Sequence, residues 1–553
     1  MTRPRAASPR KKLRSEDAPD NDHPVSSVAA TQSGAAHPER VTAGTWMTVF
    51  GGVLGAFIAV LNIHITNASL KDIQGAMGAT LEEGSFISTA YLTTEIMVIP
   101  ITGWLTQVFG LRRYILWNTA LFMVFTTLCA MAWNLESMLV FRALAGLTGG
   151  TLIPLSFAII LTLLPPSKQA LGMGMFALTA TQAPTIGPTL GGYLSENFGW
   201  ETIFYLQLIP TSIMFFLLWR GLQPAPGNRG LLKKGDWWGI ATMAIGLGAL
   251  EIVLEEGNRK DWLESAFIAR GAMIAGISLL LFFIIELTRK NPFINLRLML
   301  RRNFGLANIV NVVLGLGLYG SVFIMPLYLT QVHGYNALQI GQVMMWIGLP
   351  QLIMVPIVLR LMKIVDLRVL LAIGAGVFGL SCLLNIHMTT DYAHDSIVWP
   401  HIIRGLGMPF IMIPLSVIGT AGIEPAQVGS ASGLFNVMRN LGGSIGIALL
   451  ATFVTVREHF HSNQILEAVS LYNPITQDRL QALTGYFATL GADPELAQQQ
   501  ALLAIDAVAR RQSQVMAFND AFFVIGTAFI ISLLVIACLA KAPTAGHGPV
   551  AAD

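Results

Sequence analysis

Long runs of apolar residues, each about twenty residues long, recur along almost the whole chain. A run of that length crosses the ~30 Å hydrocarbon core of a bilayer as one α-helix. Backbone groups in lipid must be satisfied within their own element, so these runs predict helices and not loops. Charged residues make up 12% of the chain, about half the share usual in soluble domains. The sequence therefore predicts an all-α polytopic membrane protein.

The apolar runs predict fourteen spans. They fall near 45–68, 84–107, 113–132, 137–162, 171–195, 200–220, 237–255, 267–288, 304–328, 336–358, 367–387, 397–420, 429–455 and 517–541. Alternate connections are basic, beginning with Arg112 and Arg113, whereas the connections between them are acidic or neutral, as at Glu82 and Glu83. Because cytoplasmic loops carry the excess of lysine and arginine, this alternation predicts that both termini are cytoplasmic.

A weak internal repeat suggests how the spans are grouped. FRALAGLTGGTLIPLS (141–156) is similar to IRGLGMPFIMIPLS (403–416), and each opens a span that enters from the outside. Transporters built from parallel six-helix repeats show such symmetry. We therefore predict a disordered basic cytoplasmic tail (1–44), an N-terminal six-helix bundle (45–220), an inserted helix pair with flanking loops (221–300), a C-terminal six-helix bundle (301–541) and a cytoplasmic tail (542–553).

The connection 456–516 between the last two spans is exceptionally long. It contains QALTGYFATL and ELAQQQALLAIDAVARR, which have the periodicity of helices. Loops of this length are usually functional or disordered. The periodicity favours a folded cap or a docking surface on the outer side.

The fifth span contains APTIGPTLGGYL (183–194), in which prolines interrupt a glycine-rich helix. Proline removes a backbone donor and bends a helix, and small residues let a neighbouring helix approach closely. A bent, closely packed helix fits a rocking element, and ordinary membrane packing explains the same residues. The residues concerned are Pro184, Gly187, Pro188, Gly191 and Gly192.

Three ordered motifs resemble those of the major facilitator superfamily. GPTLGG in the fifth span is similar to its antiporter signature, FRALAG (141–146) to its motif of an arginine followed by a spaced glycine, and GWLTQVFGLRR (103–113) to its Gly-x-x-x-Asp-x-x-Gly-Arg-Arg loop. With fourteen spans and the long outer loop, residues 45–541 resemble the fourteen-span drug:proton antiporters of the EmrB/QacA type. The fold that this implies is two six-helix halves plus an inserted pair. The loop motif comprises Gly103, Gln107, Gly110, Arg112 and Arg113.

The sequence departs from the family pattern at two positions. Gln107 stands where the loop motif usually has aspartate, which puts the cytoplasmic latch attributed to that aspartate in doubt. Asn62, in the first-span polar segment with Thr66 and Asn67, stands where these antiporters usually carry an acid. An amide cannot titrate, so another group must carry the proton if coupling survives.

Glu95 in the second span is the acid placed nearest the bilayer centre, ~16 Å from the outer end of its helix. Ionisable groups at this depth are costly and usually face a cavity or pathway. We expect Glu95 to be the proton carrier, with Arg142 favouring its ionised form when the site opens. The alternative is a permanent structural ion pair between Glu95 and Arg142. His64 could assist proton transfer, although a single histidine near an interface is more often only hydrogen-bonded.

Other buried polar residues have weaker functional interpretations. Glu251 is placed one turn from the outer interface, where its side chain could reach water. Arg404 and Arg439 are expected to pin helices of the second half. The three cysteines lie in apolar runs with no disulfide or metal-binding spacing.

No nucleotide-binding, hydrolase or metal motif occurs in the sequence, which argues against an enzyme or an ATP-driven pump. We expect a secondary transporter that uses the proton gradient, with no cofactor, no metal and no nucleic-acid partner. The resemblance implies export of hydrophobic toxic compounds from a bacterial inner membrane, with a periplasmic membrane-fusion adaptor and an outer-membrane channel as partners. The alternatives are a dedicated exporter of one endogenous metabolite, such as a siderophore, fatty acid or lipid, or an adaptor-anchoring protein with little transport of its own.

Overall fold

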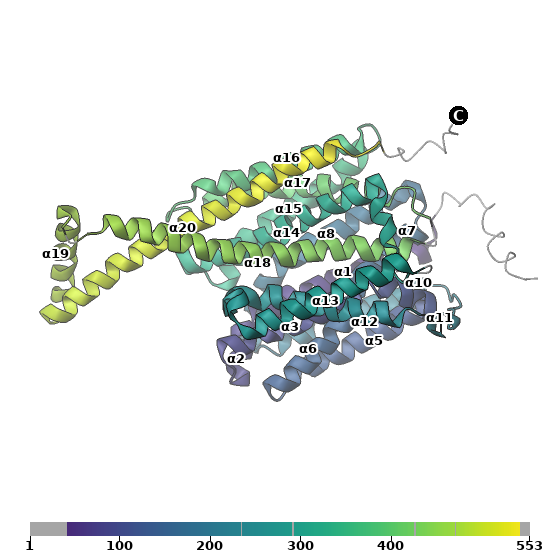
Figure 1. Ribbon diagram of the computed structural model, residues 1–553, viewed down its shortest axis with the longest axis horizontal. Coiled ribbons are helices and arrows are strands. Elements are labelled where there is room, and N and C mark those ends of the chain that lie inside the picture. Colours follow the sequence, from purple (N-terminus) through teal and green to yellow (C-terminus); the bar gives the residue numbers. More distant parts are fainter. Residues whose placement is uncertain (1–40, 234, 290–291, 425–426, 471, 542–553) are drawn as a thin grey trace, which may run out of the picture. The chain divides into compact units, whose positions relative to one another are not determined.

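The computed structural model describes residues 41–541, except 234, 290–291, 425–426 and 471. The predicted tail 542–553 and all but the last four residues of the predicted tail 1–44 lie outside the described residues. Within the described part every regular element is a helix, which confirms the all-α prediction (Figure 1).

The first ten helices cover the first six predicted spans and, with α2, the connection between the first two. They are α1 (Ala43–Ala68), α2 (Leu70–Met77), α3 (Leu81–Val98), α4 (Thr102–Phe109), α5 (Leu111–Ala130), α6 (Leu135–Gly149), α7 (Leu152–Leu163), α8 (Pro166–Phe198), α9 (Thr202–Leu206) and α10 (Leu208–Gly221). Two of these spans are broken helices: α3 and α4 meet at a bend of 60° around Pro100, and α6 and α7 are separated at Gly150. Proline at 100 removes one backbone donor, which explains a break at that point.

The remaining helices follow the predicted order as well. They are α11 (Gly230–Lys233), α12 (Trp237–Gly257), α13 (Ala266–Thr288), α14 (Arg302–His333), α15 (Ala337–Leu361), α16 (Leu367–Leu383), α17 (His394–Thr420), α18 (Val428–Ala468), α19 (Pro474–Thr489) and α20 (Pro494–Ala537). Short 3₁₀ turns cover Asn258–Lys260, Trp262–Glu264, Leu296–Leu300 and Leu384–His387.

Among the described residues, eleven helices are long and apolar enough to cross a membrane, and twelve if the bent α3–α4 pair is one span. The other two predicted spans coincide with α5 and α8. Arg112, Arg113 and Asn118 lower the hydropathy of α5, and many glycines and threonines lower that of α8. The count of fourteen therefore stays a prediction, although every predicted span overlaps a helix.

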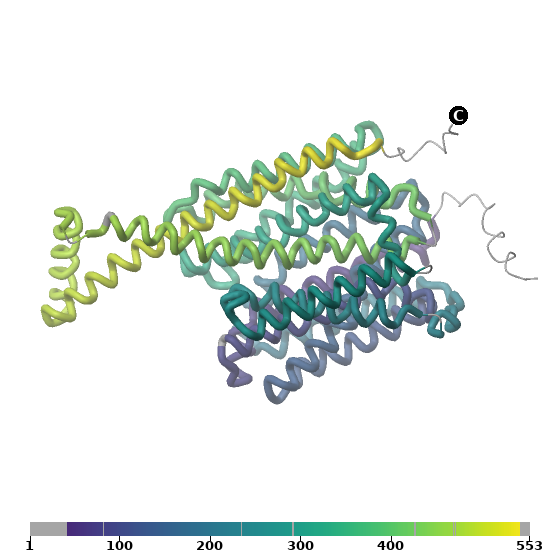
Figure 2. The backbone as a smooth tube through the Cα atoms, viewed as in Figure 1, coloured from purple at the N-terminus to yellow at the C-terminus, as the bar shows by residue number. Residues whose placement is uncertain are grey.

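The helices pack in one pattern that occurs twice. In the first half α1 packs against α8 and α10, and α6 packs against α3 and α5. In the second half α14 packs in the same way against α18 and α20, and α17 against α15 and α16. The tube in Figure 2 follows these two bundles, with α12 and α13 running beside the first.

The two bundles meet differently on their two sides. On one side α8 and α15 lie together over a long stretch, where Thr181 Oγ1 donates to Gln351 Oε1 (2.6 Å) and Gln182 Nε2 to the Gly348 carbonyl (2.7 Å). On the other side α18 contacts α4 and α7 of the first bundle, and the inserted helix α12 contacts both α3 and α18. The inserted pair is therefore part of the junction between the bundles.

The segment 456–516, which we call the extension, is helical as its periodicity predicts. Helices α18 and α20 continue beyond the bundle, and α19 joins their far ends (Figure 1). Asp520 on α20 ties the two long helices at the base, because its carboxylate accepts from Arg457 Nε (2.6 Å) and lies 2.7 Å from His461 Nε2, both on α18. We call the side of the bundle that carries the extension the extension end. The opposite side, where α1 begins and α20 ends, is the termini end.

Candidate functional site

A cavity of about 670 Å³ lies between the two bundles. Its walls come from α1, α2, α3, α7 and α8 of the first bundle, from α14, α15 and α18 of the second, and from the inserted helix α12. A concave space shared by both halves is where this architecture would hold a small molecule.

The cavity reaches the extension end. Four polar residues line it there: Lys71 and Asp72 on α2, Glu196 near the end of α8, and Asn336 directly before α15. The Asp72 carboxylate is fixed there by a hydrogen bond from the Ser195 hydroxyl.

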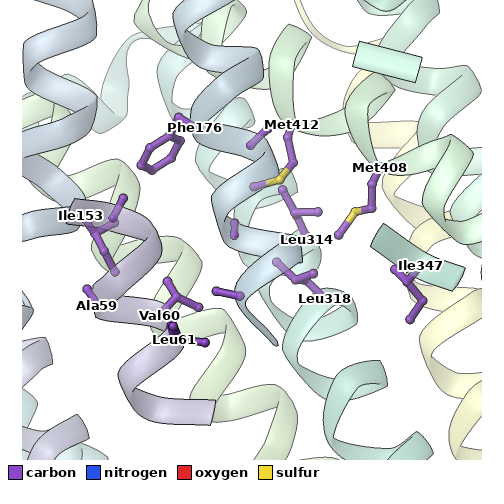
Figure 3. Close-up of a cluster of buried hydrophobic side chains, with 14 of the residues drawn as sticks. Ala59, Val60, Leu61, Ile153, Phe176, Leu314, Leu318, Ile347, Met408 and Met412 are labelled. Atoms are coloured by element: carbon purple, nitrogen blue, oxygen red, sulfur yellow. The ribbon is translucent and has the colours of Figure 1, made fainter. Parts of the chain in front are cut away.

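Toward the termini end the space between the bundles is filled. Phe157 on α7 lies 5.6 Å between ring centroids from both Phe176 on α8 and Phe435 on α18. Apolar side chains from both bundles form one buried cluster (Figure 3), which includes Ala59, Val60, Leu61, Ile153, Phe176, Leu314, Leu318, Ile347, Met408 and Met412. The described conformation is therefore closed at the termini end and hollow toward the extension end.

The loop motif takes part in this closure through its glycine. A Cβ on Gly103 would lie 2.9 Å from the backbone carbon of Gly429 on α18, so only glycine lets α4 and α18 approach so closely. Gly110 has a φ of 82°, and a Cβ there would lie 2.5 Å from the Ala225 carbonyl oxygen. Arg112 donates to the Trp219 carbonyl (3.0 Å), while the side chains of Gln107 and Arg113 are exposed.

Glu95 lies in the last turn of α3 before the bend and lines the cavity. It is 3% exposed, and within the described part of the chain its Oε2 has no hydrogen-bond partner. Gly150 packs directly on it, because a Cβ there would lie 2.8 Å from the Glu95 Cα. The glycines after Arg142 thus let α3 lie against α6 and set the position of this carboxyl.

Arg142 is held by neutral groups. Its NH1 donates to Asn62 Oδ1 (2.6 Å), its Nε donates to the Ile87 carbonyl (3.2 Å), and its guanidinium lies 4.5 Å from the centroid of the Tyr91 ring. The ion pairs found in the described structure do not include one between Arg142 and Glu95. The alternative of a permanent structural pair is therefore not what this conformation shows.

Asn62 supplies the acceptor that an acid would supply at the same place. Its Oδ1 accepts from Arg142, and its Nδ2 donates to Gln207 Oε1 (2.7 Å). Thr66 Oγ1 donates to the Asn62 carbonyl (2.7 Å), a bond within α1. The fully buried Asn62 thus joins α1, α6 and the Gln207 junction between α9 and α10 as a neutral bridge.

His64 and Asn67 are the predicted first-span residues that line the cavity. Asn67 accepts from Ser88 on α3 (2.5 Å) at its Oδ1, and His64 lies against α8. The polar residues of the first span therefore fall into two groups, one buried and one at the cavity wall. Asn62 and Thr66 are buried among helices, whereas His64 and Asn67 border the space.

Helix α8 is one continuous helix through both prolines of the antiporter signature. Pro184, Pro188 and Gly192 line the cavity. Gly187 and Gly191 face α1, since a Cβ at Gly187 would lie 2.7 Å from the His64 Cβ and one at Gly191 would lie 2.7 Å from the Ile65 carbonyl oxygen. The signature forms a close junction with α1 that also borders the cavity.

The inserted helix α12 adds two carboxyl groups to the cavity lining, and the sequence pattern did not predict either of them there. Glu251 and Glu255 line the cavity, and Glu251 is 2% exposed with its Oε1 accepting from Ser444 Oγ on α18 (2.8 Å). The expectation that Glu251 reaches water at the interface is therefore wrong, because α18 covers it. The detectable signal was the i, i+4 spacing of two acids in an apolar helix.

Arg404 and Arg439 lie outside the cavity lining. Arg404 is buried between the rings of Phe378 (5.7 Å) and Phe522 (5.5 Å), and Arg439 donates to Asn436 Oδ1 (2.8 Å). Arg404 thereby links α17 to α16 and α20, and Arg439 links α18 to α8, because its guanidinium lies 5.4 Å from the centroid of the Phe176 ring. Within the described residues no group of three or more histidines, cysteines or acids is placed to hold a metal ion.

The family model of the Major Facilitator Superfamily matches residues 52–447. The chain is 34% identical to the colistin resistance protein EmrB of Acinetobacter baumannii, covering 87% of this chain and 94% of that protein. It is 30% identical to the multidrug export protein EmrB of Escherichia coli K12, covering 90% and 95%. The fatty acid resistance protein FarB of Neisseria gonorrhoeae is 28% identical, covering 92% and 98%.

Solved structures agree on the fold. The human organic anion transporter MFSD10 (TETRAN) matches with a TM-score of 0.55 at 13% identity, covering 89% of this chain and 99% of that one. A POT family transporter in complex with a thioalcohol-conjugated peptide matches with a TM-score of 0.55 at 13% identity, covering 88% and 95%. The paired bundles, the shared cavity and these similarities agree: the chain belongs to the Major Facilitator Superfamily and is a transporter of the EmrB-like kind, not an enzyme.

Proposed function

We propose that the protein is a proton-coupled antiporter that exports hydrophobic or amphipathic toxic compounds. The observation that carries this proposal is Glu95, a deeply buried carboxyl without a hydrogen-bond partner at Oε2 on the wall of the cavity between the bundles. A titratable group at membrane depth beside a substrate-sized space is what proton coupling requires.

Transport requires the protein to alternate between a conformation open at the extension end and one open at the termini end. In the described conformation the cavity reaches the extension end, which the distribution of lysine and arginine assigns to the outside. Here Glu95 takes up a proton as substrate leaves outward. When the termini end opens, Glu95 gives the proton to the cytoplasm and substrate enters. The positive charge of Arg142, one helix away and held by neutral groups, stabilises the carboxylate at that stage.

Asn62 has no part as a proton carrier in this scheme, because an amide does not titrate. It holds Arg142 in place in both protonation states of Glu95. Glu95 therefore takes the role that the first-span acid has in the pattern that this sequence resembles.

We place the protein in the inner membrane of a Gram-negative bacterium, with both termini cytoplasmic and the extension in the periplasm. We expect the extension to bind a periplasmic adaptor, which would connect the protein to an outer-membrane channel. Its far part exposes large apolar side chains: Tyr472, Ile475, Tyr486, Leu490 and Leu503. Exposed apolar surface on a rigid helical projection is suited to protein contacts.

Transport in inverted membrane vesicles tests this proposal. A proton gradient should drive uptake of a lipophilic fluorescent substrate by the native protein, and substrate should in turn discharge the gradient. Glu95→Gln should abolish both effects. Glu286→Gln is the matched control, because Glu286 is equally buried (2% exposed) but lies on α13 outside the cavity lining, where it accepts from the Ile294 amide (3.3 Å). Equal gradient-driven transport by native protein and Glu95→Gln would refute the proposal.

A further inference from the structure

The inserted helix α12 is built into the cavity wall. Glu256 joins α12 to α3 by accepting from Ser85 Oγ (3.0 Å) and Thr89 Oγ1 (2.8 Å), and Trp262 just after α12 donates to Thr452 Oγ1 on α18 (2.9 Å). Glu251 adds a second link to α18 through Ser444. These contacts hold α12 between the two bundles, with one of its faces on the cavity.

That face carries two carboxyl groups one helical turn apart. Glu251 and Glu255 stand at positions i and i+4, so they project from the same side of α12, and both line the cavity with Glu95. Glu256 is one residue further on and is absent from the lining. It is fully buried against α3 instead.

Two of these carboxyl groups have oxygens that the protein leaves unused. Glu251 Oε1 accepts from Ser444, but Glu251 Oε2 has no partner in the described structure, and neither has Glu95 Oε2. Both side chains are at least nine-tenths buried, with exposures of 2% and 3%. A buried acceptor without a partner is unfavourable, so two such oxygens on one cavity indicate that something in the cavity binds them.

The charge of the lining indicates the sign of that ligand. Among the described side chains that border the cavity, Lys71 is the one lysine or arginine, and it lies at the mouth beside Asp72, while His64 lies deeper on α1. The deeper lining has carboxyl groups and no lysine or arginine. Opposite charges attract strongly where water is scarce, so a lining of carboxyl groups favours a cation over an anion.

The rest of the wall indicates a large organic cation. The part of the chain that the structure describes has no metal-binding grouping of histidine, cysteine and acidic residues. The cavity lining instead includes Tyr319, Phe323 and Ile447. Aromatic and aliphatic side chains suit an organic cation with a delocalised or shielded charge, since ring faces also attract cations.

We propose that Glu251 and Glu255 of the inserted helix, together with Glu95, bind the charged group of lipophilic organic cations in this cavity. The inference rests on the proposed function only in taking the cavity as the transport route. It goes further by assigning the recognition of the substrate's charge to named carboxyl groups and by giving the inserted helix α12 a direct role in that recognition.

Equilibrium binding to the purified full-length protein in detergent tests the proposal without any proton gradient. Tetraphenylphosphonium and tetraphenylborate are suitable probes, because they have nearly the same shape and opposite charge. The native protein should bind the phosphonium at least about tenfold more tightly than the borate. Equal affinities, or preference for the borate, would overturn the proposal, and this comparison needs no variant.

Substitutions then locate the preference. The double variant Glu251→Gln with Glu255→Gln should lose most of the preference for the phosphonium, with borate binding equal or tighter. Glu256→Gln, on the same helix but outside the lining, should keep it. Thermal unfolding and gel filtration establish that each variant is folded. A folded double variant that keeps the native preference would refute the role of α12.

The two proposals fail separately. If the phosphonium preference holds but no compound is carried by a proton gradient, the antiport proposal is wrong and the cation site stands. If gradient-driven export depends on Glu95 but the native protein binds both probes equally, the cation site is wrong and antiport stands.

Discussion

Replacing Asn62 with alanine should destabilise the protein by about 2–4.5 kcal/mol. The substitution removes the oxygen that accepts from Arg142 NH1 at 2.6 Å and the amide that donates to Gln207 Oε1 at 2.7 Å. A hydrogen bond to a charged group contributes about 1.5–3 kcal/mol, and a neutral one about 0.5–1.5 kcal/mol. Both bonds are fully buried, and Arg142 is 1% exposed, so water cannot replace the lost acceptor.

Two other variants make this prediction specific. Asn62→Asp should be close to native in stability, because an aspartate still accepts from Arg142 and the Gln207 amide can turn to donate. Thr66→Val should cost less than about 1 kcal/mol, because it removes only a bond from Thr66 to the backbone of its own helix. The measurement is reversible unfolding in mixed micelles, followed by tryptophan fluorescence. If Asn62→Ala is as stable as native protein, or if Asn62→Asp is less stable than Asn62→Ala, the bridge does not hold Arg142 as described.

Three more predictions concern the frame around the cavity. Gly150→Ala should lower the free energy of unfolding by about 1–3 kcal/mol and reduce transport, because the new Cβ would lie 2.8 Å from the Glu95 Cα and α3 must move. A variant with the unfolding and transport of the native protein would contradict this. Asp520→Ala should speed proteolysis of the extension while leaving the spans intact, because Arg457 and His461 lose their shared acceptor; unchanged cleavage kinetics would count against the tie at the base. Hydrogen bonds from Arg368 lower the pKa of Asp366, which lies between α15 and α16. The Asp366 carboxylate therefore stabilises the folded protein above the ordinary carboxyl pKa of ~4, and this stabilisation is lost as pH falls through the lowered pKa. Asp366→Asn should accordingly unfold earlier than native protein at pH 7, and a difference that persists at a pH well below 3 would refute that origin.

Much of the fold could be predicted from the sequence because apolar length and helical periodicity are local properties. Each predicted span overlaps a helix, and the periodic segment 456–516 is helical. Glu95 was found on the same basis, since depth along a single helix can be counted. The cavity lining around it depends on which helices meet.

The missed residues are those whose role depends on a distant neighbour. Counting from the end of its span predicts Glu251 at the interface, and nothing local reveals that α18 covers it and that Ser444 donates to it. The Arg142–Asn62 bond joins residues eighty positions apart, and Gln207 is further still. Contacts of this kind follow from packing between helices, which a periodic pattern does not encode.

The central claim is that Glu95 exchanges a proton when substrate occupies the cavity. The most direct test is proton release by the purified protein in weakly buffered detergent solution, followed with a pH indicator as a transported compound is added. The native protein should release protons in proportion to bound substrate, and Glu95→Gln should bind substrate without release. Equal release by both proteins, or none by the native protein at saturating substrate, would contradict the account.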